Sequence, residues 1–258
     1  MTAMRRTVYT LSYSSQNADI EVRLNDLYVG ATREDGEERG QVYLNSCIAC
    51  SGEQKLTWIV EQRDSDDESS KAAELNIDVA RVCLETDNMN VVEYKTVFST
   101  HLEGDDVIDG QSVFEADVQY CIDLGLESEE LPQQNNIEEM VLDVYRKWNR
   151  LTDEGRYREV VMMLDKHDSN DMDCHYWTLT EEERRQRIED FEDILSSGFR
   201  LVMPEEEDKL VYYGNGRLVR YVRPDGTGAF VLRNDDGDEY PMNIYMYRPI
   251  GRNGLEII

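Results

Sequence analysis

Cysteine and histidine are the residue types in this 258-residue chain whose spacing could support chemistry. Cys47-Ile-Ala-Cys50 is a lone Cys-x-x-Cys pair. A structural zinc site needs a second pair of Cys or His ligands at short spacing, and the sequence holds none. Redox use needs such a pair at the start of a helix, but here a strand-like segment follows. Because the five cysteines are odd in number and widely spaced, we expect buried or half-buried free thiols.

A second group of reactive types lies between His167 and His175, where Cys174 and several aspartates stand close in sequence. It could be a metal cluster or a Cys-His pair, but either role needs fixed geometry, and the segment is expected to be a loop between helices. The run 168–173 resembles a calcium loop, yet Asp173 stands where an EF-hand needs glycine. We therefore predict no metal site and no catalytic residue here.

Other signatures of enzymes are missing from the sequence. Gly214-x-Gly216 resembles the start of a dinucleotide fingerprint, but it lacks the third glycine and joins two expected strands. No nucleophile elbow and no His-Glu-x-x-His motif occur. We predict a protein that is not an enzyme and that binds no cofactor.

The net charge of the chain argues against two classes of binding partner. Its 55 acidic and 27 basic residues leave a formal net charge of −28. Phosphates of nucleic acids and anionic lipids repel such a chain, so neither a nucleic acid nor a membrane is an expected partner. Residues 1–13 lack the apolar core of a secretion signal, which makes the cytoplasm the expected location. A salt-adapted organism would produce the same acidic bias, and this alternative stays open.

Acidic residues gather in three loop-like segments of the first half. They could be solvated charge that protects sheet edges, or a negative surface for a basic partner. They do not follow the ligand order of a calcium loop. Our candidates for partner binding are Glu34, Asp35, Glu37, Glu38, Asp64, Asp66, Asp67, Glu68, Asp105 and Asp106.

The first half is predicted to be an all-β antiparallel sandwich. Ile20, Val22 and Leu24 alternate on one face of a strand, and Asn25-Asp26 supplies a turn after it. Short strands at this spacing, with almost no helical period, favour a sandwich. The expected strands are 19–24, 27–29, 41–44, 54–61, 75–84, 91–98 and 113–120.

The second half is predicted to be an α+β domain. An apolar stripe from Ile137 to Leu151 predicts a first helix, 157–164 a shorter second one, and the capping box from Thr180 to Glu183 a third that starts at Glu181. An antiparallel meander should follow. Its expected strands are 209–213, 217–222, 228–233, 243–247 and 255–258. The predicted domains are residues 1–126 and 137–258, joined by a linker at 127–136 that holds Pro132 and a polar run.

The meander is rich in tyrosine and arginine, which dominate the energetics of protein interfaces. Ordinary packing of the sheet explains the same composition, so both interpretations stay open. The residues are Tyr212, Tyr213, Tyr221, Tyr240, Tyr245 and Tyr247 among Arg217, Arg220, Arg223, Arg233 and Arg248.

The order of elements in the second half, with Tyr145 and Trp148 on its first helix, resembles the nuclear-transport-factor-2-like cone fold. That resemblance implies a cone-like sheet, in a family that includes both small-molecule enzymes and pure binding proteins. The segments 18–29 and 114–120 resemble the sandwich half of uncharacterised bacterial two-domain proteins. Some of those look like immunity partners of secreted antibacterial toxins.

We therefore expect a cytoplasmic, acidic protein-binding module, an immunity-type protein that neutralises a basic antibacterial toxin. One alternative is an enzyme or ligand-binding protein that uses a cone cavity. A deep pocket with a buried His or Asp would favour it, and a cone filled by Tyr145, Trp148 and Phe191 would oppose it. The other alternative is a DNA mimic, which needs carboxylates in rows at the spacing of phosphates.

Overall fold

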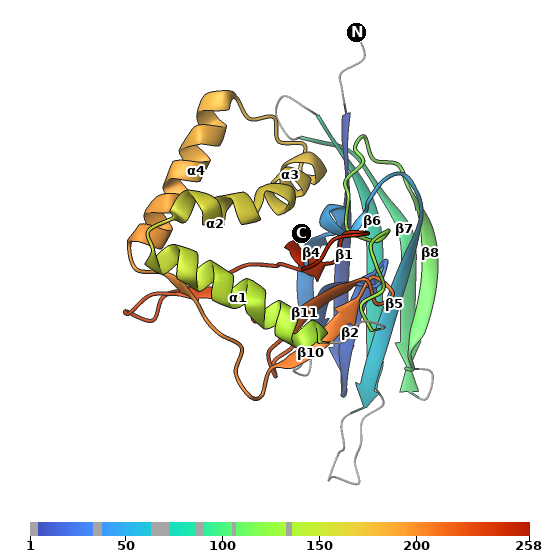
Figure 1. Cartoon of the computed structure of the whole chain (residues 1–258). Helices are drawn as coiled ribbons and strands as arrows, with labels where there is room; N and C mark the ends of the chain where they lie inside the picture. The colour runs from blue at the N-terminus through green and yellow to red at the C-terminus, as the bar shows by residue number, and fades with distance from the viewer. Residues whose placement is uncertain (1–4, 33–37, 63–72, 86–89, 105–106, 133–135) are drawn as a thin grey trace. The chain divides into compact units, whose positions relative to one another are not determined.

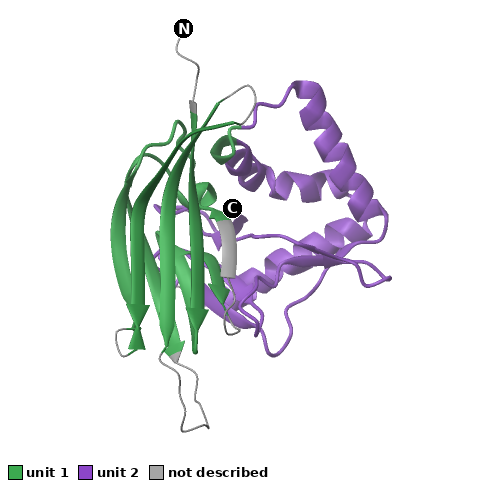
Figure 2. Cartoon of the chain, turned by 180° about the vertical axis from the view of Figure 1, so that it is seen from behind, with its two compact units in different colours: residues 1–122, 173–176 green, residues 123–172, 177–258 purple. Residues whose placement is uncertain are grey.

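A computed structural model describes residues 5–32, 38–62, 73–85, 90–104, 107–132 and 136–258. The chain divides into two compact units (Figure 2). Unit 1 consists of Met1–Ile122 and Asp173–Tyr176, and unit 2 of Asp123–Met172 and Trp177–Ile258. Among the described residues, none of the helices combines the length and the apolar character that crossing a membrane requires.

Unit 1 is rich in sheet, as the alternating patterns predict (Figure 1). Its described strands form two antiparallel sheets, in the orders β4-β1-β6-β7 and β3-β2-β5-β8. Asn25 and Asp26 both have positive φ in the tight turn between β2 and β3, as the sequence predicts. The strands are β1 (Arg5–Gln16), β2 (Ala18–Leu24), β3 (Leu27–Thr32), β4 (Glu38–Tyr43), β5 (Gly52–Gln62), β6 (Glu74–Glu85), β7 (Val91–Glu103) and β8 (Gly110–Ala116).

The two sheets of unit 1 meet through aromatic side chains. The ring of Tyr9 on β1 lies 5.5 Å from that of Phe114 on β8, and Trp58 on β5 stacks on Phe98 of β7 at 6.1 Å. A Cβ atom at Gly30 of β3 would overlap the hydroxyl of Tyr13 on β1. Glycine at this position therefore lets the opposite sheet approach closely. The side chains that alternate inward form the core of unit 1 between these two sheets.

Two details of unit 1 differ from the sequence prediction. The first is β1, a long strand in a segment where the sequence analysis predicted no strand. Several of its buried residues are Thr or Ser, among them Thr7, Thr10 and Ser15, so the hydrophobic alternation that indicates a strand is not visible in its sequence. The last expected strand ends at Ala116, before Tyr120, because the chain leaves the ladder after pairing with Gly52.

The described residues from 136 onward contain four helices, where the sequence predicts three. The stripe of α1 (Ile137–Asp153) is confirmed, since Val141, Tyr145 and Trp148 on it are buried. The capping box at Thr180 is also confirmed as the start of the last helix. The remaining helices are α2 (Tyr157–Met163), α3 (Asp165–Cys174) and α4 (Glu181–Ser196). The prediction of a loop between the second and third predicted helices is therefore wrong, because this segment forms helix α3.

The strands of unit 2 form two small sheets rather than one meander. Their orders are β10-β11-β14-β15 and β13-β12-β9. β12 pairs with β9 and β13 instead of β11, because after the bridge between Val222 and Gly228 the chain leaves the first sheet. The strands are β9 (Arg200–Leu201), β10 (Lys209–Tyr213), β11 (Leu218–Val222), β12 (Val231–Arg233), β13 (Glu239–Pro241), β14 (Met246–Tyr247) and β15 (Glu256–Ile257).

The described part of the segment predicted as a linker belongs to unit 2 and packs with its core. Leu131 is fully buried in the core cluster of unit 2, and its amide donates to the carbonyl of Gly216. The guanidinium of Arg217 donates to the carbonyl of Ser128. The domain boundaries at 126 and 137 stay predictions.

Candidate functional site

The acidic candidates for partner binding lie almost entirely outside the described residues. This holds for Glu34, Asp35, Glu37, Asp64, Asp66, Asp67, Glu68, Asp105 and Asp106. Glu38 is the first residue of β4, where its backbone pairs with Ser14 of β1. A candidate binding surface therefore has to be sought among the other acidic residues, whose positions the structure describes.

One such group covers the outward face of the sheet formed by β2, β5 and β8. Leu56 and Trp58 of β5 point to the core, so the residues between them point out. The same alternation turns acidic residues outward on all three strands. We call this surface the acidic sheet face; it consists of Asp19, Glu21, Arg23, Glu53, Lys55, Thr57, Ile59, Glu61, Gln111, Val113 and Glu115.

The strand register places acidic residues of this face directly opposite each other. Asp19 of β2 pairs with Glu61 of β5, and Glu53 of β5 pairs with Glu115 of β8. Directly opposite residues have Cβ atoms roughly 4.5–5.5 Å apart, and like charges at that distance destabilise a sheet. The face therefore carries two like-charge pairs, one toward each end of β5.

Apolar side chains lie between the two acid pairs. Ile59 and Val113 are 38% and 55% exposed, although both belong to strands with a buried opposite face. Arg23 on β2 is already engaged, because it bonds Glu21 at 2.6 Å and Asp26 at 2.9 Å. The middle of the face is polar, because Thr57 pairs with Arg23 on one side and with Gln111 on the other, and the two exposed apolar side chains lie apart from each other.

A third acid pair lies on the other sheet of unit 1. Glu74 of β6 faces Glu103 of β7, and here a histidine lies beside them. His101 Nε2 lies 2.9 Å from Glu103, and its Nδ1 lies 2.6 Å from the side-chain oxygen of Asn76. A histidine within hydrogen-bond distance thus accompanies this pair.

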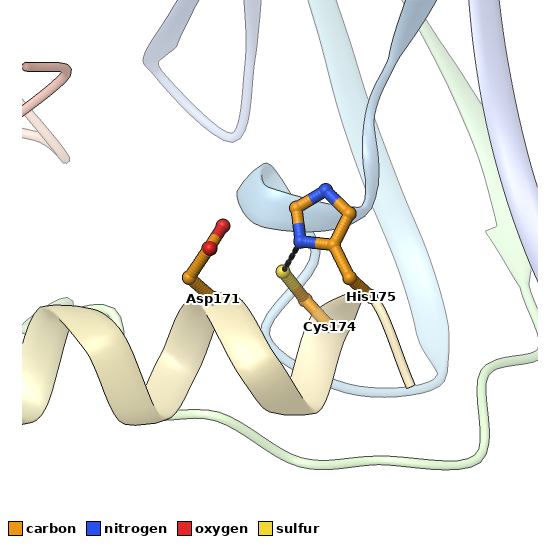
Figure 3. Close-up of side chains that lie close together, drawn as sticks. All are labelled: Asp171, Cys174 and His175. Carbon is orange, nitrogen blue, oxygen red and sulfur yellow. Dashed lines mark hydrogen bonds between the residues drawn. The ribbon is translucent and has the colours of Figure 1, made fainter. Parts of the chain in front are cut away.

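The group that the sequence placed in a loop lies on the last turn of α3. Asp171, Cys174 and His175 stand at helical positions i, i+3 and i+4, which share one face of a helix. Figure 3 shows their side chains projecting to the same side of the ribbon. Their donor atoms all lie within 4.8 Å of one another, and Cys174 Sγ lies 3.3 Å from His175 Nδ1. The expectation of a loop is wrong for this segment, because Asp171 and Cys174 lie in a helix.

Electrostatic groups on unit 2 bear on the aspartates of α3. Burial raises the pKa of Asp168, and the nearby Arg187 acts in the opposite direction. The guanidinium of Arg187 also lies 3.7 Å from Asp171 and over the ring of Trp177. Arg187 therefore supplies positive charge to this carboxylate-rich helix.

Most of the tyrosines of the C-terminal strands belong to the core. Tyr213, Tyr221, Tyr245 and Tyr247 are buried, which supports packing of the sheet over an interface role for them. Arg220 is buried as well; it lies over the rings of Tyr213 and Tyr245 and donates to Asn243 at 2.6 Å. Tyr240 is the exposed member of the set.

The interior of unit 2 is filled by aromatic rings. Trp148 and Tyr145 are buried, and each lies close to 5 Å from Phe230, at 5.2 Å and 5.1 Å between centroids. Phe191 contacts Trp148 edge-on at 6.5 Å. Among the described residues of this unit, no histidine or aspartate is buried.

Comparison with protein-family models, curated proteins and solved structures gave no match to this chain. The sites therefore stand on their own residues. Sequence reasoning missed the acid pairs because a strand register joins residues that are far apart in the chain. The sequence does contain a signal for them: in the expected strands 19–24, 54–61 and 113–120, acidic residues recur at positions that alternate with the apolar ones.

Proposed function

We propose that this protein is a binding module for a basic protein, and that the partner binds the acidic sheet face. The observation that carries the proposal is the pairing of Asp19 with Glu61 and of Glu53 with Glu115. Opposed carboxylates cost stability in the free protein. A lysine or arginine from a partner, placed between two carboxylates, would remove that cost and gain attraction to both.

The two exposed apolar side chains of the face support a protein as the partner. Ile59 and Val113 offer apolar area that a simple cation would leave exposed, whereas a protein surface would bury it. The net charge of −28 adds long-range steering of a cationic partner. We propose a cytoplasmic immunity-type role, in which the partner is a basic antibacterial toxin that this chain neutralises.

The same proposal extends to the fold. Inward aromatic contacts between two four-stranded sheets support a β-sandwich for unit 1. For unit 2 a cone-like fold remains a proposal, supported by its helix order before a sheet. Because its interior is filled by Trp148, Tyr145 and Phe230, a binding role without a ligand cavity is favoured over the enzyme alternative.

Charge-matched variants of the full chain test the site. The face variant carries Asp19→Asn, Glu53→Gln, Glu61→Gln and Glu115→Gln. The control variant carries Glu205→Gln, Glu206→Gln, Glu207→Gln and Asp235→Asn, all exposed residues of unit 2. Each variant loses four negative charges, so the two variants have equal net charge.

The probe is a fluorescent oligo-lysine peptide, followed by fluorescence anisotropy at low salt. We expect the face variant to bind it several-fold more weakly than the control variant, because the opposed carboxylates concentrate negative potential locally. Equal affinities of the two variants would mean that only net charge matters, and would contradict the acidic sheet face as the site.

A further inference from the structure

We infer that Asp171, Cys174 and His175 bind a divalent transition metal of the zinc class at the C-terminal end of α3 (Figure 3). This inference goes beyond the proposed function and does not depend on it. All three donors belong to one helical turn and the residue after it, so their spacing follows from the helix itself.

The donor atoms are close to the separations that a tetrahedral metal requires. Zinc bonds of about 2.3 Å to sulfur and about 2.0–2.1 Å to nitrogen place the two donors roughly 3.6 Å apart. Cys174 Sγ and His175 Nδ1 lie 3.3 Å apart. The carboxylate of Asp171 lies within 4.8 Å of both, so a shift of about 1 Å completes the three-ligand set.

The chemistry of the donors selects the metal. A thiolate and an imidazole suit zinc-class metals, whereas calcium and magnesium prefer oxygen ligands alone. Three protein ligands leave a fourth position for water. A nucleophilic role for Cys174 fits less well, because its side chain is 1% exposed and a substrate could not reach the sulfur.

A metal that binds here has to compete with the groups that already contact its donors. Arg187 lies 3.7 Å from Asp171, and both side chains are partly exposed, so this one ion pair is weak. Cys174 donates to or accepts from His175 in the absence of metal. On binding, the thiol proton of Cys174 passes to solvent and the metal takes its place.

A second pair of thiols could mimic a metal site and must be controlled. Cys50 and Cys121 are both exposed and share a side-chain hydrogen bond in unit 1. The test therefore starts from the variant with Cys50→Ser and Cys121→Ser, in which Cys174 keeps its surroundings.

The measurement is titration of this full-length variant with Co²⁺ alone, followed by displacement with Zn²⁺. We expect one equivalent of Co²⁺ with a thiolate-to-cobalt absorption band, which Zn²⁺ abolishes. Adding His175→Gln or Asp171→Asn should weaken binding by at least about tenfold, and adding Cys174→Ser should remove the band. Circular dichroism checks that each variant is folded.

Two results would overturn the inference. One is the absence of a thiolate band when Cys50 and Cys121 are replaced. The other is a band whose affinity is unchanged by His175→Gln, a half-buried residue whose replacement leaves the buried Cys174 in place. If Cys174→Ser fails to fold, the His175 and Asp171 variants still decide the outcome.

Discussion

Asp19 and Glu61 are two acidic residues that lie directly opposite each other on neighbouring strands. Arg23, four residues further along β2, bonds two acids on its own strand and turn. Asp19 instead faces Glu61, and Glu53 faces Glu115. Acids placed directly opposite each other lower the stability of a sheet.

The cost of the acid pairs can be measured directly. Glu61→Gln and Glu115→Gln should each raise the free energy of unfolding by about 0.2–1 kcal/mol, since each removes a like-charge pair. Denaturant unfolding at low ionic strength measures the change. Added salt should shrink it, because salt screens exposed charges.

Glu206→Gln serves as the control, because Glu206 lies in a turn outside the strands. We expect little change in its free energy of unfolding. Losses of stability in Glu61→Gln and Glu115→Gln would show that the opposed acids do not repel each other.

Asn45 is a buried residue whose amide joins separate segments of unit 1. Its Oδ1 accepts from the amide of Tyr9 at 2.8 Å, and its Nδ2 donates to the carbonyls of Thr7 and Cys174. Asn45→Ala should lower the free energy of unfolding by at least about 2 kcal/mol, because each buried group left unpaired costs roughly 1–3 kcal/mol. Denaturant unfolding checks this value.

Asn76→Ala is the comparison, since Asn76 is half-buried and water can replace its bonds to Ser14 and Glu74. Its loss should be clearly smaller. Equal losses in Asn45→Ala and Asn76→Ala would argue against the buried network.

At the scale of elements, the sequence predicted those helices whose start and burial depend on residues close together in the chain. The stripe of α1 and the capping box of α4 are local, and both helices begin where the sequence predicts. α3 has no comparable signal: its ten residues, Asp165–Cys174, are mostly polar and hold three aspartates besides Asp171. Its helical state depends on contacts made after folding, so the geometry of Asp171, Cys174 and His175 could not be predicted from sequence.

The start of α4 offers a test of local structure. The Thr180 hydroxyl accepts from the Glu183 amide at 3.2 Å, and Glu183 accepts from the Thr180 amide at 2.7 Å. Thr180→Ala should lower the free energy of unfolding by about 1 kcal/mol. Thr180→Ser, which keeps a hydroxyl, should lose much less; equal losses would contradict the cap.

The same cap has a predicted pH dependence. The hydrogen bonds from the amide and hydroxyl of Thr180 lower the pKa of Glu183 in the folded state. A carboxyl with a lowered folded pKa contributes its stability above its unfolded pKa, about 4.3, and loses it as the pH falls through the folded value. The difference in unfolding free energy between the wild type and Glu183→Gln should therefore shrink in acid. A constant difference from neutral pH to pH 3 would contradict this.

At the scale of the molecule, composition supplies the net charge on which the proposed basic partner rests, but it does not indicate where such a partner would bind. The net charge of −28 follows from the sequence alone. The acidic runs that drew attention in the sequence lie outside the described residues, apart from Glu38. The acid pairs depend on which strands become neighbours, and that is a property of the whole sheet. The division of the C-terminal strands into two sheets likewise depends on long-range pairing of β9 with β12.

The central claim is that the acidic sheet face binds a basic protein. Its most direct test is capture from native cell lysate on three immobilised full-length proteins: the wild type, the face variant and the charge-matched control variant. Mass spectrometry identifies the bound proteins at low and moderate salt. If duplex DNA releases the captured protein, the DNA-mimic alternative gains support over the toxin.

We predict that the wild type and the control variant retain the same cationic protein and that the face variant does not. Recovery of that protein by all three would contradict the account, as would failure of the wild type to retain any cationic protein at either salt concentration.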